Sequence, residues 1–231
     1  MKNLLLTALA ALALMAFGGT VATAADPNSI VVPAQEQNYG QLGANWWKWA
    51  LSIPYQQNPQ FDTTGASCGL GQNGGVWFLA GTPGGSVTRS CTIPAGKTIF
   101  FPIVNINNDY PCPDPNFQPA PGQSLRDFLT DGAVFVINHA HDLNANLDGV
   151  DIPIVSSYRG TSNMYSFVGD PSLAAVFDPC ITGSQQKAVS DGYWLLLAPL
   201  SPGTHTLSFG ATITIEDFSF STEATYNLTV Q

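Results

Sequence analysis

Most of the chain alternates between short apolar runs and turn residues, a pattern typical of β-structure. Runs rich in valine, isoleucine, threonine and aromatic residues recur from residue 74 onward, separated by glycine and proline. They include "GGVWFLAG", "RSCTIPAGKTIFFPIVN", "YWLLLAPLSPGTHTLSFGATITI" and "ATYNLTV". These runs predict strands, and "PAGK" and "SPGT" between them predict the turns of hairpins. We therefore expect a mainly β fold, a single β-sandwich domain of the jelly-roll or immunoglobulin-like type.

One segment before these runs, "NYGQLGANWWKWALSIP", has a helical pattern instead. Its apolar positions are spaced by four, three and one residues: Leu42, Trp46, Trp49 and Ala50. The spacing predicts an N-terminal tryptophan-rich amphipathic helix over residues 39–51 that is closed by Pro54. We expect Trp46 and Trp49 to seal the open end of the sandwich. Trp47 points to a different face, so we expect it to be partly exposed.

A second helix is predicted at "SLRDFLTDGAVFVINHAHDL". Ser124 and Asp127 resemble a capping box, and apolar residues follow at helical spacing. Gly132 weakens this prediction, and "AVFVI" also suits a strand. After this segment, Asp148 and Gly149 separate two alternating runs and predict a two-residue hairpin turn.

The N-terminal residues indicate export. Lys2 precedes an apolar run over residues 4–17, and small residues follow up to Ala24. This order predicts a signal peptide over residues 1–24, and the run is too short for a membrane-spanning helix. Residues 25–231 then form one domain by length, and we expect a secreted or periplasmic protein without stable insertion into a membrane.

The cysteines support the same compartment. Four cysteines occur in the chain, all after the predicted signal peptide: Cys68, Cys91, Cys112 and Cys180. An even number in an exported chain predicts two disulfide bonds, and three connectivities are possible. We favour Cys68 with Cys91 and Cys112 with Cys180, because nearest-neighbour pairing suits successive strands and loops.

The charge of the chain narrows the classes of partner. The formal net charge is −9, and only 10% of the residues are charged. Such an acidic surface repels phosphate backbones and anionic lipids. Nucleic acids and membrane surfaces are therefore excluded as expected partners. The oligomeric state is not indicated by the sequence.

Aromatic residues are the best candidates for ligand binding. Sugar rings pack their C–H faces on indole and phenol rings, and binding pockets often combine aromatic side chains with a few polar groups. The residues that we assign to a possible carbohydrate or cell-surface ligand are Trp47, Trp77 and Tyr110.

Two other kinds of site stay open as alternatives. Three imidazoles could form a metal site if the fold brings them together: His139, His141 and His205. A pair of carboxylates could serve a hydrolase, with four candidates: Asp62, Asp109, Asp142 and Asp178. No G-x-S-x-G, H-E-x-x-H or phosphate-binding loop occurs in the sequence, so no catalytic residue, cofactor or metal is assigned.

Several of these motifs occur together in a known pattern. The ordered set "WWKWALSIP", "RSCTIPAGKTIFFPIVN" and "DGYWLLLAPLSPGTHTLSFGA" resembles a family of uncharacterised bacterial secreted proteins. The resemblance spans nearly the whole mature chain. It implies no known activity, so it gives no residue a catalytic or binding role.

These observations favour a non-enzymatic exported β-sandwich protein of the periplasm or cell exterior that binds carbohydrate or another surface ligand. A hydrolase of an extracellular polymer and a histidine-based metal-binding protein are the alternatives.

Overall fold

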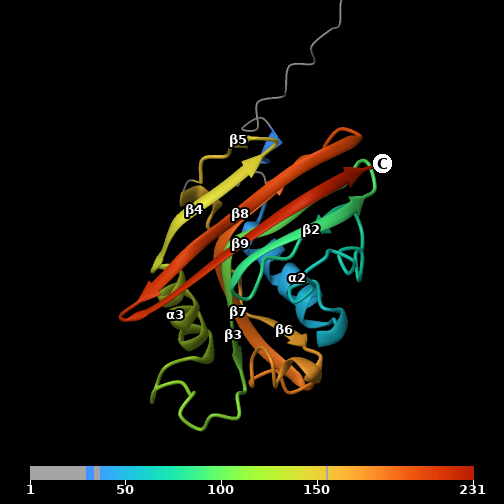
Figure 1. Ribbon diagram of the computed structural model, residues 1–231. Coiled ribbons are helices and arrows are strands. Elements are labelled where there is room, and N and C mark those ends of the chain that lie inside the picture. The colour runs from blue at the N-terminus through green and yellow to red at the C-terminus, as the bar shows by residue number, and fades with distance from the viewer. Residues whose placement is uncertain (1–29, 34–36, 155) are drawn as a thin grey trace, which may run out of the picture.

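The computed structural model describes residues 30–33, 37–154 and 156–231. The predicted signal peptide lies outside the described residues. Within them, nine strands form two sheets that cross obliquely, and two helices flank them (Figure 1). No helix among the described residues is both long and apolar enough to cross a membrane.

One sheet, called the β3–β7 sheet, has the strand order β1-β3-β7-β6. Its strands are β1 (Val76–Phe78), β3 (Thr98–Tyr110), β7 (Gln185–Leu197) and β6 (Tyr165–Val168). Its β1 and β3 are parallel, whereas β7 is antiparallel to both of its neighbours.

The other sheet, called the β8–β9 sheet, has the order β2-β9-β8-β4-β5. Its strands are β2 (Gly85–Ile93), β9 (Phe218–Val230), β8 (Gly203–Ile215), β4 (Ala140–Leu147) and β5 (Val150–Asp151). Its β2 and β9 are parallel and its other pairs antiparallel. The mainly β fold is thus as predicted, and the two sheets are consistent with a β-sandwich.

Two of the predicted hairpins are wrong. The "PAGK" segment joins β2 to β3 and the "SPGT" segment joins β7 to β8, and in each case the two strands belong to different sheets. Glycine and proline allow the chain to reverse, but they do not decide which strand it then pairs with. The predicted turn at Asp148 and Gly149 is confirmed, since both residues have positive φ, 53° and 83°, between β4 and β5.

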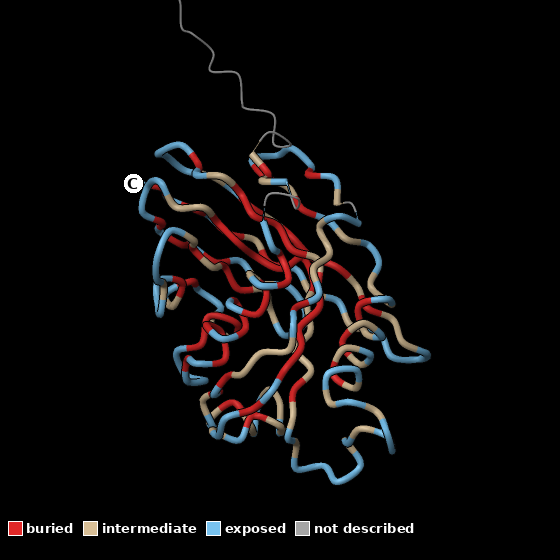
Figure 2. The backbone as a smooth tube through the Cα atoms, turned by 180° about the vertical axis from the view of Figure 1, so that it is seen from behind, coloured by how far each residue is buried: buried red, intermediate tan, exposed pale blue. Residues whose placement is uncertain are grey.

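The main core lies between the two sheets. Alternate residues of β7, such as Leu195 and Leu197, face Leu207 and Phe209 of β8, and all four are buried. Figure 2 shows the burial concentrated along the central strands, with exposed residues at the turns.

Helix α2 (Tyr39–Leu51) confirms the predicted tryptophan-rich helix, and the Asn38 side chain caps its first turn. It packs on the outer face of the β3–β7 sheet, so the expectation that it seals an end of the sandwich is wrong. The reason lies in β3 and β7, whose apolar runs leave hydrophobic side chains on both faces. Phe100 and Trp194 belong to the second core under α2, whereas their chain neighbours face the other sheet.

Helix α3 (Leu125–Ile137) confirms the second predicted helix, and Ser124 accepts a hydrogen bond from the Asp127 N–H at its start. It packs on β3 and β7 through a third small core that contains Leu129 and Val189. Gly132, which weakened the prediction, is explained by close packing, because a Cβ atom there would lie 2.3 Å from Asn108 Nδ2.

Both favoured disulfide bonds are present, Cys68 with Cys91 and Cys112 with Cys180. The first ties the segment before β1 to β2. The second ties the segment after β3 to the segment before β7. Short irregular connections carry three 3-10 turns: Tyr55–Gln57, Ser156–Tyr158 and Pro171–Leu173.

Candidate functional site

Strand β3 has one edge that is only partly covered. The three-residue strand β1 pairs with residues 98–100, and no further strand of the described chain pairs with that edge beyond them. Pro102, which has no N–H to offer, and a bulge between Pro102 and Val104 follow directly. Proline and bulges are features that protect exposed strand edges from pairing with another chain.

A groove lies along this open edge and has a volume of about 320 Å³. It runs from the tryptophans of α2, past the edge of β3, to the facing ends of β8 and β9. The residues that line it are Trp46, Trp47, Gln60, Gly81, Thr82, Pro83, Pro102, Ile103, Val104, Asn105, Ile106, Val136, Phe177, Ile213, Ile215, Phe218, Phe220 and Thr222. None of them is charged, and the size suits a small molecule.

Phe218 is the most exposed of the large hydrophobic side chains that line the groove. It is 65% exposed, at the first residue of β9. Phe220 follows on the same face of the strand, next to Gly84 of the segment before β2. Exposed apolar side chains around a concavity are typical of ligand-binding sites.

The three tryptophans of α2 are all buried, but they differ in their polar atoms. Trp46 Nε1 donates to the Leu79 carbonyl and Trp49 Nε1 to the Leu70 carbonyl, each at 2.8 Å. Trp47 Nε1 is buried and has no partner among the described residues. The expectation that Trp47 is partly exposed is wrong, since it is 3% exposed and its ring stacks on that of Phe177.

Two side-chain amide groups that line the groove also have a buried nitrogen without a partner. Gln60 Nε2 and Asn105 Nδ2 are buried, and neither has a hydrogen-bond partner among the described residues. A buried donor without a partner costs about 1–3 kcal/mol relative to a paired one. The walls of the groove therefore contain three buried nitrogen donors that the protein leaves unpaired.

The other two residues assigned to a ligand lie elsewhere. Trp77 of β1 is buried in the core between the sheets. Tyr110 ends β3 and packs beside α3, near Phe117 and Phe128. The structure therefore does not bring Trp47, Trp77 and Tyr110 together.

The three histidines do not meet either. His139 contacts the Phe135 carbonyl after α3, while His141 contacts Asp142 and Thr214 on β4 and β8. His205 lies near the opposite end of β8, where it contacts Asp148. Burial opposes protonation of His205, yet its bonds to Asp148 and Ser201 raise its pKa. No group of three metal-binding side chains is found in the described part of the chain.

Two of the four candidate aspartates lie near each other on the α2 side of the β3–β7 sheet. Asp109 is buried and accepts hydrogen bonds from Asn107, at 3.2 Å, and Gln186, at 2.7 Å. Burial raises the pKa of Asp109 to about 7, and the charge of Asp178 adds to this rise. Burial also raises the pKa of Asp178, which accepts a bond from the Cys180 N–H. Neither aspartate lines the groove.

The other two candidate aspartates are placed apart. The Asp62 carboxylate accepts hydrogen bonds from the backbone N–H groups of Ser67 and Thr64 in its own turn. Burial alone would raise the pKa of Asp62, but the hydrogen bonds have the larger combined effect and lower it. Asp142 lines a shallow polar depression on the outer face of the β8–β9 sheet, together with Glu223 and several hydroxyl side chains.

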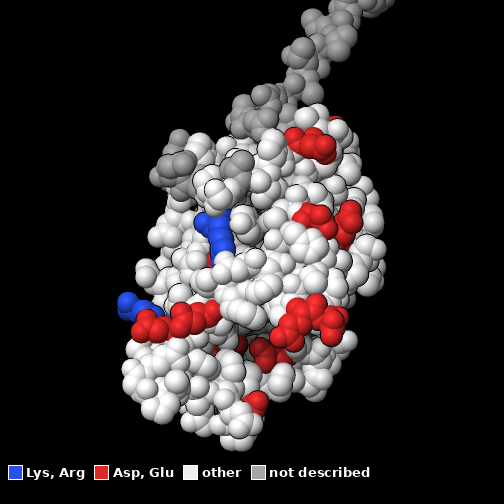
Figure 3. Space-filling view, turned by 90° about the vertical axis from the view of Figure 1, so that its left-hand side faces the viewer, with Lys and Arg blue, Asp and Glu red and all other residues white. Residues whose placement is uncertain are grey.

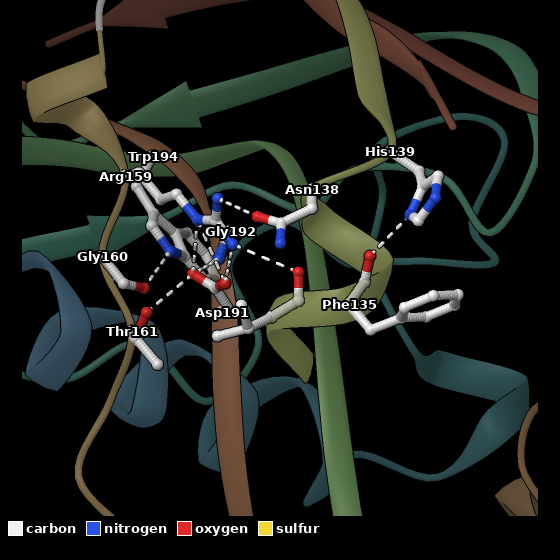
Figure 4. A network of polar contacts seen from close by, with 10 residues as sticks. Phe135, Asn138, His139, Arg159, Gly160, Thr161, Asp191, Gly192 and Trp194 are labelled. Carbon is white, nitrogen blue, oxygen red and sulfur yellow. Dashed lines mark hydrogen bonds and ion pairs between the residues drawn. The ribbon is translucent and has the colours of Figure 1, made fainter. Parts of the chain in front are cut away.

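The most connected polar network is an ion pair between the half-buried Arg159 and the fully buried Asp191. Asp191 is fully buried on β7 and accepts from Arg159 Nε at 3.1 Å and from Nη2 at 2.5 Å. Thr161 and the Gly192 N–H also donate to it, and Arg159 reaches Asn138 at the end of α3 (Figure 4). Both carboxylate oxygens of Asp191 and all three guanidinium nitrogens of Arg159 have hydrogen-bond partners. The network therefore connects α3 to β7 and is not a candidate ligand site.

Arg89, unlike Arg159, is a buried cation, and its hydrogen-bond partners are all neutral. Its guanidinium donates to four carbonyl oxygens and to the Tyr226 hydroxyl, from 2.6 to 2.9 Å. Two of these carbonyls belong to the groove residues Gln60 and Gly81. Arg89 thus holds one end of the groove in place, and each of its three guanidinium nitrogens donates to an oxygen of the protein.

The surface agrees with the sequence charge. On the face that carries α3 and β4, acidic side chains outnumber basic ones (Figure 3).

No protein-family model, curated protein or solved structure matches this chain. The resemblance to bacterial secreted proteins stays a prediction. A function must therefore be argued from the geometry itself, and the groove is the best candidate. Sequence reasoning found Trp47 but missed Gln60, Asn105 and Phe177, which come from loops and a strand edge that only the fold brings together.

Proposed function

We propose that this protein is a non-enzymatic, exported β-sandwich protein that binds a small apolar molecule in the groove along β3. The observation that carries this proposal is an uncharged, mainly apolar cavity of about 320 Å³ with the exposed ring of Phe218 at its wall. Filling such a cavity removes apolar surface from water on both partners, which contributes roughly 25 cal/mol per Å².

An apolar ligand suits this groove better than a carbohydrate. Sugars need many hydrogen-bond partners as well as an aromatic platform, and only four lining residues carry polar side chains: Gln60, Thr82, Asn105 and Thr222. Of the residues first assigned to a sugar, only Trp47 lines the groove.

The proposal also includes export of the protein from the cytoplasm and a jelly-roll or immunoglobulin-like type of sandwich. Two disulfide bonds are compatible with an extracellular or periplasmic protein. The signal peptide over residues 1–24 and the jelly-roll or immunoglobulin-like type of the domain remain predictions.

The test is a titration of the mature protein with N-phenylnaphthylamine, a neutral dye whose fluorescence rises in apolar sites. We expect saturable binding that is lost in Ile215→Trp, because the larger ring fills the groove. Val168→Trp adds the same ring at an exposed site outside the groove and should bind like the wild type. Absence of binding by wild type, or equal binding by Ile215→Trp, contradicts the proposal.

A hydrolase is the second candidate, favoured by one observation. Asp142 and Glu223 line the same shallow depression, which is open to solvent and rich in hydroxyl groups. If this pair acts on a polymer, purified protein hydrolyses polysaccharide and Glu223→Gln does not. No hydrolysis of a broad glycan panel by the wild-type protein would remove this candidate.

A further inference from the structure

Buried donors without partners are concentrated at the groove. Five buried side-chain nitrogen or oxygen atoms lack a partner in the described part of the chain. Three of the five are Trp47 Nε1, Gln60 Nε2 and Asn105 Nδ2, and all three residues line the groove. They come from α2, a loop and the open edge of β3, so no single local distortion explains them.

Outside the groove, only two buried side-chain polar atoms of the described residues lack a partner, Trp77 Nε1 and Ser190 Oγ. Trp46, next to Trp47 on α2, donates to a carbonyl, and each nitrogen of the Arg89 guanidinium finds an oxygen. The protein can therefore satisfy buried N–H groups, even beside the groove. The contrast indicates that a partner for the three donors comes from outside the chain.

The chemistry of the three groups specifies this partner. An indole N–H can only donate, and the two unpaired amide atoms are nitrogen donors as well, so a ligand that pairs with them brings an acceptor. No lysine, arginine or histidine lines the groove, and each of the three Arg89 nitrogens already donates to an oxygen of the protein. A buried carboxylate without a cation is costly, whereas a carbonyl oxygen is not.

We propose that the groove takes a neutral apolar molecule that carries a carbonyl oxygen, which accepts hydrogen bonds from Trp47 and from one or both amides. This inference rests on the proposed function and names its ligand class. All three nitrogen atoms are buried from solvent. Contact therefore needs a small side-chain rotation, and Phe177, which stacks on Trp47, and Asn105 are only half-buried.

Three ligands with one apolar skeleton test the proposal: ethylnaphthalene, acetylnaphthalene and naphthoate. Each is titrated into a mixture of the mature wild-type protein and N-phenylnaphthylamine, and the affinity is measured from displacement of the dye. One additional net hydrogen bond corresponds to roughly a tenfold gain in affinity. We expect acetylnaphthalene to bind about tenfold more tightly than ethylnaphthalene, and naphthoate to bind more weakly than acetylnaphthalene.

Trp47→Phe identifies the donor, because it removes the N–H and keeps an aromatic ring. We expect the ratio between the ketone and the hydrocarbon to fall toward one, with little change for ethylnaphthalene. Trp77→Phe is the matched control, since Trp77 Nε1 is also buried and unpaired but lies outside the groove. It should keep the wild-type ratio. Gln60→Met, which removes an amide at similar length, gives a second reading if Trp47→Phe does not fold.

The outcomes separate the two proposals. If no naphthalene ligand and no dye binds, the proposed function fails and this inference fails with it. If hydrocarbon and ketone bind equally well, the groove is a binding site but the donors do not recognise a carbonyl. If naphthoate binds most tightly, the ligand class is anionic and the neutral assignment is overturned.

Discussion

The two halves of β3 differ in what covers the same edge of the strand. Along residues 98–100, β1 pairs with the edge, the Leu79 N–H donates to the Phe100 carbonyl, and Trp46 donates to the Leu79 carbonyl. Beyond them the edge is open, and the groove there contains the unpaired nitrogens of Trp47 and Asn105. Trp46 and Trp47 are neighbours on α2, yet the Nε1 atom of Trp46 is paired near the covered part of the edge, whereas that of Trp47 is unpaired at the open part.

This difference teaches that the edge of β3 stays open where β1 ends. A strand of three residues ends before Pro102, and nothing in the described chain replaces it. Each buried unpaired donor costs about 1–3 kcal/mol, so the open half carries a stability deficit that a bound ligand can remove.

The largest expected effect on stability concerns Trp46, which lies near the part of the β3 edge that β1 covers. Trp46→Ala removes a fully buried indole and should lower the free energy of unfolding by about 3–5 kcal/mol. Trp47→Ala should cost less, because Trp47 Nε1 has no hydrogen bond to lose. Urea denaturation measures both. Losses below about 1 kcal/mol at both positions would mean that the second core under α2 does not form.

Breaking the Arg159 and Asp191 pair should have an effect nearly as large. Arg159→Met leaves the fully buried Asp191 carboxylate without its cation, and such losses amount to about 3–5 kcal/mol. Arg126→Met removes an exposed arginine of α3 and should change stability by less than about 0.5 kcal/mol. Equal effects of both substitutions in a urea melt would contradict a structural role for the pair.

The buried Asp109 should make stability depend on pH. Its pKa is raised from 3.8 to about 7, first by burial and then by Asp178, so between these values the folded state holds a proton that the unfolded state has lost. The free energy of unfolding should therefore fall as pH rises from about 4 to about 7. The linkage limit is roughly 4 kcal/mol, or three pKa units.

Asp109→Asn should remove most of this fall and should be more stable than the wild type at pH 8. Part of the fall should remain, because the raised pKa values of Asp178 and His205 act in the same direction. Asp217→Asn, at an exposed turn, should follow the wild-type curve. Thermal melts of the three proteins across this pH range test the prediction. If the stability of Asp109→Asn falls with pH as steeply as that of the wild type, the raised pKa of Asp109 is refuted.

The smallest expected effect is the difference in stability between Trp46→Phe and Trp47→Phe, which each remove one indole N–H group. Trp46→Phe leaves the Leu79 carbonyl without its donor and should cost about 1–3 kcal/mol beyond the loss of ring area. Trp47→Phe removes a buried donor that has no partner, so the relief of that unpaired group offsets part of the loss of ring area. Equal losses in denaturant melts would mean that Trp47 has a partner in solution.

Local patterns in the sequence predicted the local structure well. Helical spacing placed α2, the Ser124 cap placed α3, and Asp148 with Gly149 placed the β4–β5 turn. These features depend on neighbours within a few residues. The pairing of β2 with β9 and of β3 with β7 depends on distant segments, which is why the "PAGK" and "SPGT" hairpins were predicted wrongly.

The candidate site was predictable only in part. Trp47 stands out in the sequence, but its burial depends on Phe177, which is 130 positions away and reaches it only in the fold. Gln60 and Asn105 are ordinary amides in sequence, and nothing near them indicates an unpaired donor. Their common property depends on the tertiary packing around the groove, which leaves no local signal in the sequence.

The most direct test of the central claim observes the indole N–H groups themselves. In protein labelled with nitrogen-15 at its five tryptophans, each indole N–H gives one NMR signal, and Trp47→Phe assigns that of Trp47. When acetylnaphthalene saturates the groove, we predict a downfield shift of the Trp47 proton signal, typical of a new hydrogen bond, and a smaller shift for Trp46. Saturation by acetylnaphthalene with an unmoved Trp47 signal would contradict the account.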